Sequence, residues 1–558
     1  MLTEYKRRFS AALGRWLTFF HWPPSATLPV ATGLLIAFKF WLVRGEDIIG
    51  SATQYDGLWY VRSAVEWYWG SAYGWTAFIR PCAYPLWLAL VHLLHLPLRV
   101  AIELLQLGGA LVLLGAFRGL GVNRWTSYLS FACIALHPAG FQLNNYTASD
   151  TFYAGVLWYV VGGLLWTYAT RKTGPSIATG LAVGILWNTR EEAFLIVVLL
   201  AVWLALLFLG EKGNRPVAGV AAMNTVRPFA VVCAVAALVV FSAYTANYFV
   251  FKSFTRSEMT ARSFQSLFHS LLRIRPSEPK PFAPITMDTL HRAFSVSPTF
   301  ATLSQHLDGP LGEAWRIETY RQTGVPGEIG VGWIVWATRE AASKNGVFET
   351  PEKAQRFFKQ AAREIDAACD DGRLPARFVL GGFLDPLGQS EGWSKLPQSA
   401  LRVGGRIFAR WSLEPVPDDE ILTTAEASLY DEMTRRRSAP ARENKGSAVA
   451  LQNFIGRYHF VLVIVLHLGA FGAILLLRRP GLLSPGYTGA LLLLGCAVFS
   501  RLLLFAWLDA TAFDSTQDRF LFPVLPLWMA FLVVTIGAIM QARLSGKPDL
   551  GTVGSALR

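Results

Sequence analysis

Charged residues are scarce in this chain. Asp, Glu, Lys and Arg make up 16% of its 558 residues, whereas hydrophobic residues make up 53%. A soluble domain carries about a quarter charged residues, so the composition excludes a soluble protein of this length. The apolar residues are gathered in runs long enough to cross a bilayer. The chain is therefore predicted to be a polytopic membrane protein with one large polar insertion.

Motifs for soluble cofactors and for metals are missing as well. The five cysteines have no CxxC or metal-type spacing. No Gly-rich loop precedes a Lys-Ser or Lys-Thr pair, and no GxGxxG motif follows a strand, which argues against a nucleotide substrate. Cys82 and Cys369 are both expected on the outer side of the membrane, and the sequence leaves open whether a disulfide joins them.

The net charge of +13 has a topological explanation. Lys and Arg residues largely flank apolar segments, as the positive-inside rule requires, so nucleic acid is not an expected partner. The basic clusters at 6–15, 171–172 and 478–479 are assigned to the cytoplasm. The charged residues of the other loops then lie on the outer face. We expect this to be the periplasmic face of a bacterial inner membrane.

Apolar run length predicts an all-α fold of about ten transmembrane helices, with outer juxtamembrane helices and a mainly α-helical extracytoplasmic domain. The candidate spans are roughly 26–44, 83–98, 100–117, 125–141, 150–170, 174–189, 192–209, 228–251, 456–477, 484–507 and 519–541. The chain accordingly divides into a transmembrane module at 1–251 with an outer loop at 45–82, a soluble domain at 252–455, and transmembrane helices with a cytoplasmic tail at 456–558.

Two details of this topology stay open. Three apolar segments (83–98, 100–117 and 125–141) separate the outer residues Arg80 and Asp150, but only two can cross the membrane. Pro97 indicates a broken or re-entrant piece, without showing which segment fails to span. Lys39 lies near the outer end of the first span and is expected to snorkel to the interface.

The most informative motif follows the first span. Asp56, Tyr60 and Ala64 are four residues apart, so on a helix they share one face. Tyr and Trp crowd the stretch 54–75, and such aromatics favour the headgroup layer. One or two helices lying along the outer surface are predicted here. An aromatic belt explains the rings but not the carboxylate, which is either a helix cap or a catalytic group.

This motif resembles the first outer loop of the GT-C superfamily of membrane glycosyltransferases. The nearest branch holds the protein O-mannosyltransferases and aminoarabinose transferases, which have Asp-Glu-x-x-Tyr-x-x-x-Ala there. That branch has Lys-Pro before its second span, where this chain has Arg80-Pro81, and a small residue with Asp opening a later span, where it has Ser149-Asp150. The ordered set covers residues 26–210. Gly57 replaces the second acid, and Arg80 replaces Lys.

The resemblance implies a GT-C-like fold and a sugar transfer. The donor would be a polyprenyl-phosphate-linked monosaccharide and the acceptor a hydroxyl of a cell-envelope glycan or glycolipid, with inversion at the sugar. A transporter or flippase of a lipid-linked sugar is the alternative. Transporters usually show a midplane site and two related halves, and the sequence shows neither. A non-catalytic scaffold would leave the one-sided charges unexplained.

Such a transfer needs a base for the acceptor and cations for the phosphate. Asp56 is the predicted base, because a carboxylate in a partly dry site has a raised pKa. Asp150 is the second catalytic candidate: it would orient the acceptor or share a divalent cation with Asp56, or else cap its helix. Arg80, Arg190 and Arg519 are predicted to bind the donor phosphate.

The remaining polar residues of the outer face are assigned to substrate contacts. They are Tyr60, Glu191, Glu192, Asn145 and Gln517. Two purely structural interpretations compete with these assignments. Residues 190–192 could form a charged hairpin turn held by its own ion pair, and Arg519 could be a snorkelling anchor. Gly57 in place of an acid puts a metal site at that position in doubt, and the sequence leaves open whether a divalent cation is needed.

Overall fold

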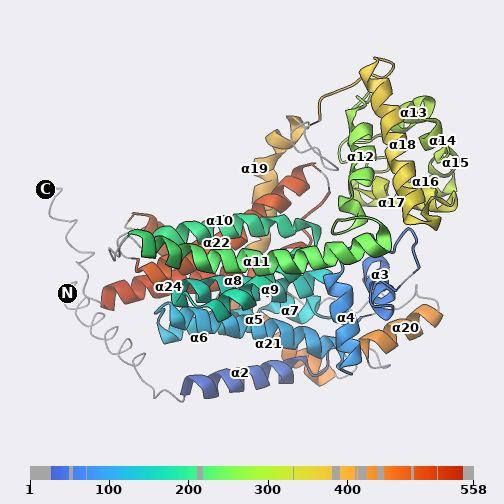
Figure 1. The fold of residues 1–558 in the computed structure, drawn as a ribbon. Coiled ribbons are helices and arrows are strands. Elements are labelled where there is room, and N and C mark those ends of the chain that lie inside the picture. Colours follow the sequence, from blue (N-terminus) through green and yellow to red (C-terminus); the bar gives the residue numbers. More distant parts are fainter. Residues whose placement is uncertain are drawn as a thin grey trace, which may run out of the picture.

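The computed structural model describes residues 27–49, 54–70, 72–209, 218–330, 332–379, 390–408, 411, 424–436, 445–478, 483–511 and 513–544. Within these ranges the chain is helical, and its β-pairing is limited to two isolated bridges. Long helices lie side by side, and a smaller helical unit covers one end of them (Figure 1). The all-α prediction is confirmed.

Seven of the described helices are long and apolar enough to cross a membrane, which confirms a multi-pass protein. They are α5 (Leu98–Gly119), α8 (Ser149–Thr170), η1 with α10 (Glu191–Phe194 and Leu195–Leu209), α11 (Ala218–Phe251), α21 (Lys445–Arg478), α22 (Pro485–Thr511) and α24 (Leu525–Leu544). The shorter apolar helices α2 (Thr27–Val43) and α9 (Thr173–Trp187) run alongside them (Figure 1).

Helix α4 (Ala83–Leu93) is too short to cross a bilayer by itself. Its 11 residues rise only about 16 Å, roughly half the hydrocarbon thickness. It lies across the ends of the long helices (Figure 1), and the N–H of Ala83 donates to the carbonyl of Asn188 in an outer loop. Helix α5 is long and apolar enough to span, whereas the segment after it is divided into α6 (Arg124–Ala135) and α7 (Pro138–Leu143), because Pro138 begins a new helix.

Helices α5 and α8 form the closest pair in the bundle. A Cβ added to Gly109 would lie 2.9 Å from the carbonyl oxygen of Gly155, and one added to Gly162 would lie 2.9 Å from Val112. Small residues at such crossings let helix backbones approach each other in a membrane. This packing fixes the position of α8, which carries Ser149 and Asp150 at its outer end.

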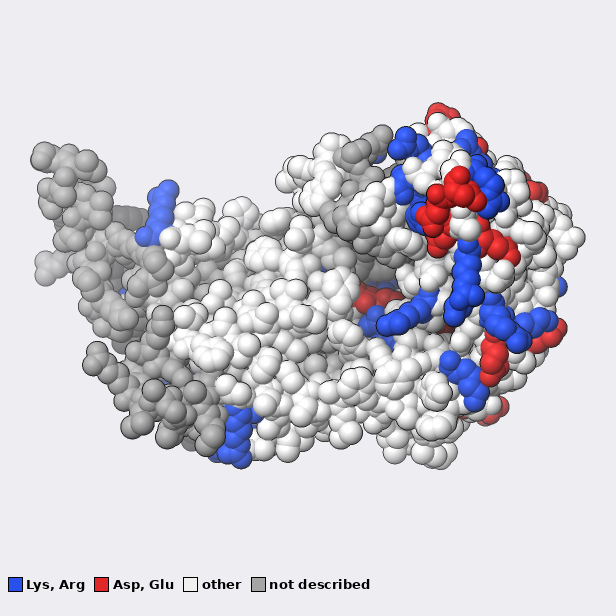
Figure 2. Space-filling view, turned by 45° about the horizontal axis from the view of Figure 1, so that its top comes forward, with Lys and Arg blue, Asp and Glu red and all other residues white. Residues whose placement is uncertain are grey.

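A compact helical unit follows α11. Its helices are α12 (Arg262–Arg273), α13 (Met287–Val296), α14 (Pro298–Ala301), α15 (Ser304–Leu307), α16 (Pro310–Thr323), α17 (Trp333–Lys344) and α18 (Pro351–Asp370). Phe264, Phe268 and Phe358 belong to its separate core. On the face of the molecule shown in Figure 2, most Lys, Arg, Asp and Glu residues lie on this helical unit, whereas the membrane helices carry almost no charged residues.

The insertion at 252–455 is not one soluble body, in contrast to the prediction. Helices α19 (Ser390–Gly405) and α20 (Thr424–Thr434) have buried side chains, such as Val403 and Tyr430, that join the core of the membrane helices. Their apolar side chains are buried against the membrane helices and contribute nothing to the separate core of α12–α18. They therefore extend the transmembrane module rather than the outer domain.

Lys39 does not snorkel. It is buried in α2, 2.7 Å from Glu103 of α5, and it donates to the carbonyl of Ala135 at 2.6 Å. Arg99 binds the same carboxylate and donates to Asn145 at 2.8 Å. A buried charge needs a partner, and here Glu103 supplies one to both cations.

Candidate active site at one end of the helix bundle

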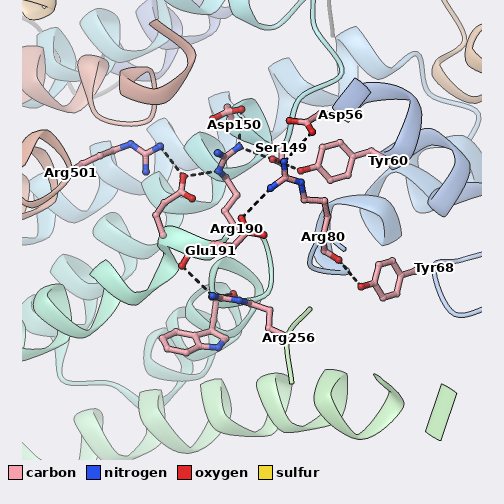
Figure 3. A network of polar contacts seen from close by, with 12 residues as sticks. Asp56, Tyr60, Tyr68, Arg80, Ser149, Asp150, Arg190, Glu191, Arg256 and Arg501 are labelled. Atoms are coloured by element: carbon pink, nitrogen blue, oxygen red, sulfur yellow. Dashed lines mark hydrogen bonds and ion pairs between the residues drawn. The ribbon is translucent and has the colours of Figure 1, made fainter. Parts of the chain in front are cut away.

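The first half of the site joins α3 to the outer loop that follows it. Asp56 lies in the first turn of α3 (Gln54–Val65), and its Oδ1 is 3.0 Å from a guanidinium nitrogen of Arg80. Arg80 also lies 3.6 Å from Glu191. Its carbonyl accepts the hydroxyl of Tyr68 at 2.6 Å, which fixes the backbone that presents the guanidinium (Figure 3). Asp56 in α3 and Arg80 in the loop after it were both predicted site residues, and they are in direct contact.

The second half lies at the start of α8 and of η1. Arg190 contacts Asp150 at 2.8 Å and Glu192 at 2.6 Å. It also donates to the hydroxyl of Ser149 at 2.9 Å, and the hydroxyl of Tyr60 lies 2.9 Å from the same oxygen. Ser149 therefore links α3 to the second half (Figure 3). The ion pair of Arg190 with Glu192 is the one expected of a hairpin turn, but the contacts to Asp150 and Ser149 go beyond it.

Arg256 and Arg501 belong to the network, but the sequence patterns did not single them out. Arg501 is 1% exposed, lies 3.2 Å from Glu192 and donates to the carbonyl of Phe520 at 2.6 Å. Arg256 donates to the carbonyl of Glu191 at 3.1 Å. An arginine within an apolar span is costly and often functional, so the position of Arg501 in α22 was the available signal. Arg256 follows α11 and carried no such signal.

The pKa of Asp56 is lowered, not raised as predicted. Burial is the largest single influence and raises this pKa, but the charges of Arg80, Arg519 and Arg190, with the hydrogen bond from Arg80, together outweigh it. Asp56 is therefore ionised at neutral pH. Burial raises the pKa of Tyr60, so its phenol keeps its proton and donates to Ser149. The raised-pKa hypothesis failed because it ignored the arginines that tertiary structure brings to the carboxylate.

A polar cavity of about 550 Å³ opens beside this network. Asp150, Arg406, Gln517 and Arg519 line it. Arg519 is in the short helix α23 (Asp518–Leu521); its Nε donates to Gln517 at 3.0 Å, and no carboxylate forms a salt bridge with its guanidinium within the described residues. Of the three arginines predicted to bind phosphate, Arg519 is the one whose charge is not already neutralised by an adjacent acid.

An apolar groove of about 1220 Å³ begins at the other side of the network. Residues of α10, α21, α22 and α24 line it, and Trp393 and Leu396 of α19 cover part of it. Phe194 lines its outer end and follows Glu192 by two residues. The groove thus includes a residue of η1, the short helix whose Glu192 binds Arg190 and Arg501.

Several buried polar atoms of the network have no hydrogen-bond partner within the described residues. They are Nε of Arg80, Oδ1 of Asp150, Oε1 of Glu191, Nε of Arg256 and Nη1 of Arg501. Buried polar groups are normally paired, and unpaired ones call for an explanation. A binding site for a polar ligand requires unpaired hydrogen-bond donors and acceptors gathered in one place, as they are here.

The outer helical unit also reaches the site. Trp336 of α17 stacks near Trp59 of α3, with ring centroids 4.8 Å apart, and the guanidinium of Arg80 lies 5.4 Å from the ring of Trp336. Next to it, the buried Arg339 forms an ion pair with Glu258. The unit therefore forms one wall around Arg80.

Asn145 is not part of the site, contrary to its assignment to substrate. Its side chain is fully buried between Arg99 and Glu46, which lies 2.6 Å from it. Asn145 instead fixes the loop that leads to Ser149. The other predicted residues, Gln517 included, lie in the network or along the polar cavity.

The residues do not fit a metal shared by Asp56 and Asp150. Each carboxylate has a guanidinium as its nearest charged partner, Arg80 for the first and Arg190 for the second. The described residues contain no group of three or more His, Cys, Asp or Glu side chains placed to hold an ion. Cys82 and Cys369 are both buried free thiols.

No protein-family model matches the chain, and no curated protein matches it significantly. Among solved structures, a crystal structure of ArnT from Cupriavidus metallidurans in the apo state is similar to it. The match covers 96% of this chain and 79% of that chain, with 14% sequence identity and a TM-score of 0.30.

Proposed function

We propose that the protein is a membrane glycosyltransferase of the GT-C type. It would move a monosaccharide from a polyprenyl-phosphate donor to a hydroxyl of an extracytoplasmic glycan or glycolipid. One observation carries the proposal: in a buried cluster of arginines and carboxylates, Asp150 lines a polar cavity, and Glu192 precedes by two residues Phe194, which lines an apolar groove. A lipid-linked sugar has this sequence of parts, an apolar chain, a phosphate and a polar ring.

The donor is assigned to the groove and the arginines. Its chain would lie along α10, α22 and α24, and its phosphate would bind Arg519, the arginine without an adjacent carboxylate. Arg501 adds a buried nitrogen without a partner. Guanidinium groups suit this task because they contact phosphate through two N–H donors and stabilise charge that develops on the leaving group.

The acceptor hydroxyl is assigned to Asp56. The oxygen of the acceptor hydroxyl would attack the anomeric carbon of the sugar while the bond from that carbon to the phosphate oxygen breaks. The hydroxyl proton would pass to Asp56, and the phosphate would leave on its lipid with the bonding electrons. A single displacement of this kind inverts the anomeric centre. Asp150 and Glu191 would accept hydrogen bonds from sugar hydroxyls through their unpaired oxygens.

Arg80 explains how an acid with a lowered pKa could act as the base. In the structure Arg80 neutralises Asp56 at 3.0 Å. A donor phosphate that binds Arg80 competes for its charge, so the pKa of Asp56 rises when substrate arrives. A base is most effective with a pKa near the working pH, so donor binding would activate it.

The direct test is a transfer assay. Purified protein in proteoliposomes is incubated with radiolabelled polyprenyl-phosphate sugars and cell-envelope acceptors, in parallel with Asp56→Asn. Label should reach the acceptor with the native protein, and the variant should lose at least about 100-fold in rate. Label that crosses the bilayer without transfer would favour a flippase. Unchanged transfer by the variant would exclude Asp56 as the base.

A further inference from the structure

A second cavity, of about 700 Å³, lies at the end of the helix bundle opposite the site. The turn between α5 and α6 forms its polar rim, with Arg118, Asn123, Arg124 and Trp125. Helices α21 and α24 supply its apolar wall, with residues such as Val465 and Ile536. The positive-inside rule places this end in the cytoplasmic leaflet.

The cavity is built by close helix packing. A Cβ on Gly537 of α24 would lie 2.3 Å from the hydroxyl of Thr126, so only glycine lets α24 approach α6 there. The N–H of Asn123 donates to the hydroxyl of Tyr487 at 3.2 Å, and a Cβ on Gly486 would meet the carbonyl of Leu120 at 2.0 Å. These contacts hold the turn that carries both arginines against the start of α22.

The lining changes from charged to apolar along the cavity. Arg118 is exposed. Among the described residues, one of its five N–H donors has a hydrogen-bond acceptor, the carbonyl of Val122 at 3.2 Å. Below it, Leu129 and Leu544 are each 46% exposed toward the region of the lipid chains. Trp125 lies between the two parts, where an indole ring is placed at a headgroup layer.

We propose that this cavity binds an anionic glycerophospholipid of the cytoplasmic leaflet. Its phosphate would contact Arg118 and Arg124, next to the N-terminus of α6, and its acyl chains would follow the apolar wall. Basic pockets between transmembrane helices on the cytoplasmic side recognise such headgroups. A soluble anion would make no favourable contacts with the apolar wall. This lipid is distinct from the donor, whose groove shares no lining residue with this cavity, and the proposal does not depend on sugar transfer.

Native mass spectrometry of the full-length protein tests the proposal, with phosphatidylglycerol and phosphatidylcholine as probes. The native protein should prefer phosphatidylglycerol. Replacing both arginines (Arg118→Gln with Arg124→Gln) should weaken its binding about 30-fold, since each basic residue near the surface contributes about 1 kcal/mol. The matched control is Arg227→Gln, because Arg227 lies at the same end in α11 but outside the cavity. It should leave the preference intact.

A third variant guards against misfolding of the double mutant. Leu129→Trp fills the apolar part without a change in charge and should also release phosphatidylglycerol. The proposal is overturned if the double variant keeps the preference, since the arginines would then serve topology alone. It is equally overturned if glycerol phosphate displaces the lipid at the same concentration, because the ligand would then be a soluble anion.

Discussion

Arg80 donates to Asp56 across 3.0 Å, and this contact joins the most informative motif of the chain to the rest of the site. The acid and the arginine were assigned to different partners, the acceptor hydroxyl and the donor phosphate. Their contact means that, without substrate, the proposed base is held in an ion pair with Arg80. Donor binding and activation of the base then become one event.

The pair predicts a pH dependence of stability. The pKa of Asp56 is lower in the folded protein than its ordinary value, so its contribution to stability is complete above that ordinary value and is lost as pH falls through the folded pKa. Asp56→Asn should therefore unfold with a weaker dependence on pH below about 4. Thermal unfolding between pH 3 and pH 7 measures this. Equal acid sensitivity of the two proteins would contradict the assignment.

Arg80→Gln should shift the acid limb of the activity profile upward. Without Arg80 the burial of Asp56 is no longer offset by its main counter-charge, so its pKa rises in the free enzyme. The rate as a function of pH should show this as a loss of kcat/KM near neutral pH. Arg80→Lys is the matched control, since it keeps the positive charge, and its acid limb should move less.

Arg519→Gln should affect donor binding more than the chemical step. Its guanidinium lines the polar cavity and forms no salt bridge within the described residues, so its removal leaves no carboxylate unpaired. We expect KM for the donor to rise about 10-fold or more, as for loss of one charge-assisted contact. Titration of the donor at saturating acceptor measures the effect. A change confined to kcat would instead place Arg519 at the reacting atoms.

Trp336→Leu should lower transfer although Trp336 belongs to the outer helical unit. Its ring stacks near Trp59 and covers the guanidinium of Arg80. Loss of that wall should loosen Arg80 and reduce kcat about 10-fold, because small displacements of catalytic groups are costly. The control is Trp315→Leu, which removes a ring from the same unit that pairs with Trp333. An equal loss in both variants would indicate general damage to the unit.

Ser149→Ala should uncouple the two halves of the site. The serine hydroxyl contacts both Tyr60 and Arg190 at 2.9 Å. Its removal leaves a buried phenol without a partner, at a cost of about 1–3 kcal/mol in stability. Tyr60→Phe combined with Ser149→Ala should recover part of that stability, which unfolding of the double variant would show. Strictly additive losses would mean that the two residues do not interact.

The sequence by itself determined the class of this protein. Apolar runs predicted the spans, since a bilayer tolerates only segments whose backbone groups bond internally. The one-sided placement of Asp56, Arg80, Asp150 and Arg190 also followed from loop charges. These features are local, or depend only on counting crossings, so they can be read along the chain.

Tertiary structure decided what the charges do. Arg501 joins Glu192 from a helix 309 residues away in the chain, and Asn145 turns inward to Arg99 although it lies beside the site in sequence. Folding also brings Arg80, Arg519 and Arg190 near Asp56, and they lower its pKa where burial alone predicted a rise. Electrostatic effects depend on distance in space and on partners from several helices, and periodicity along the sequence carries neither.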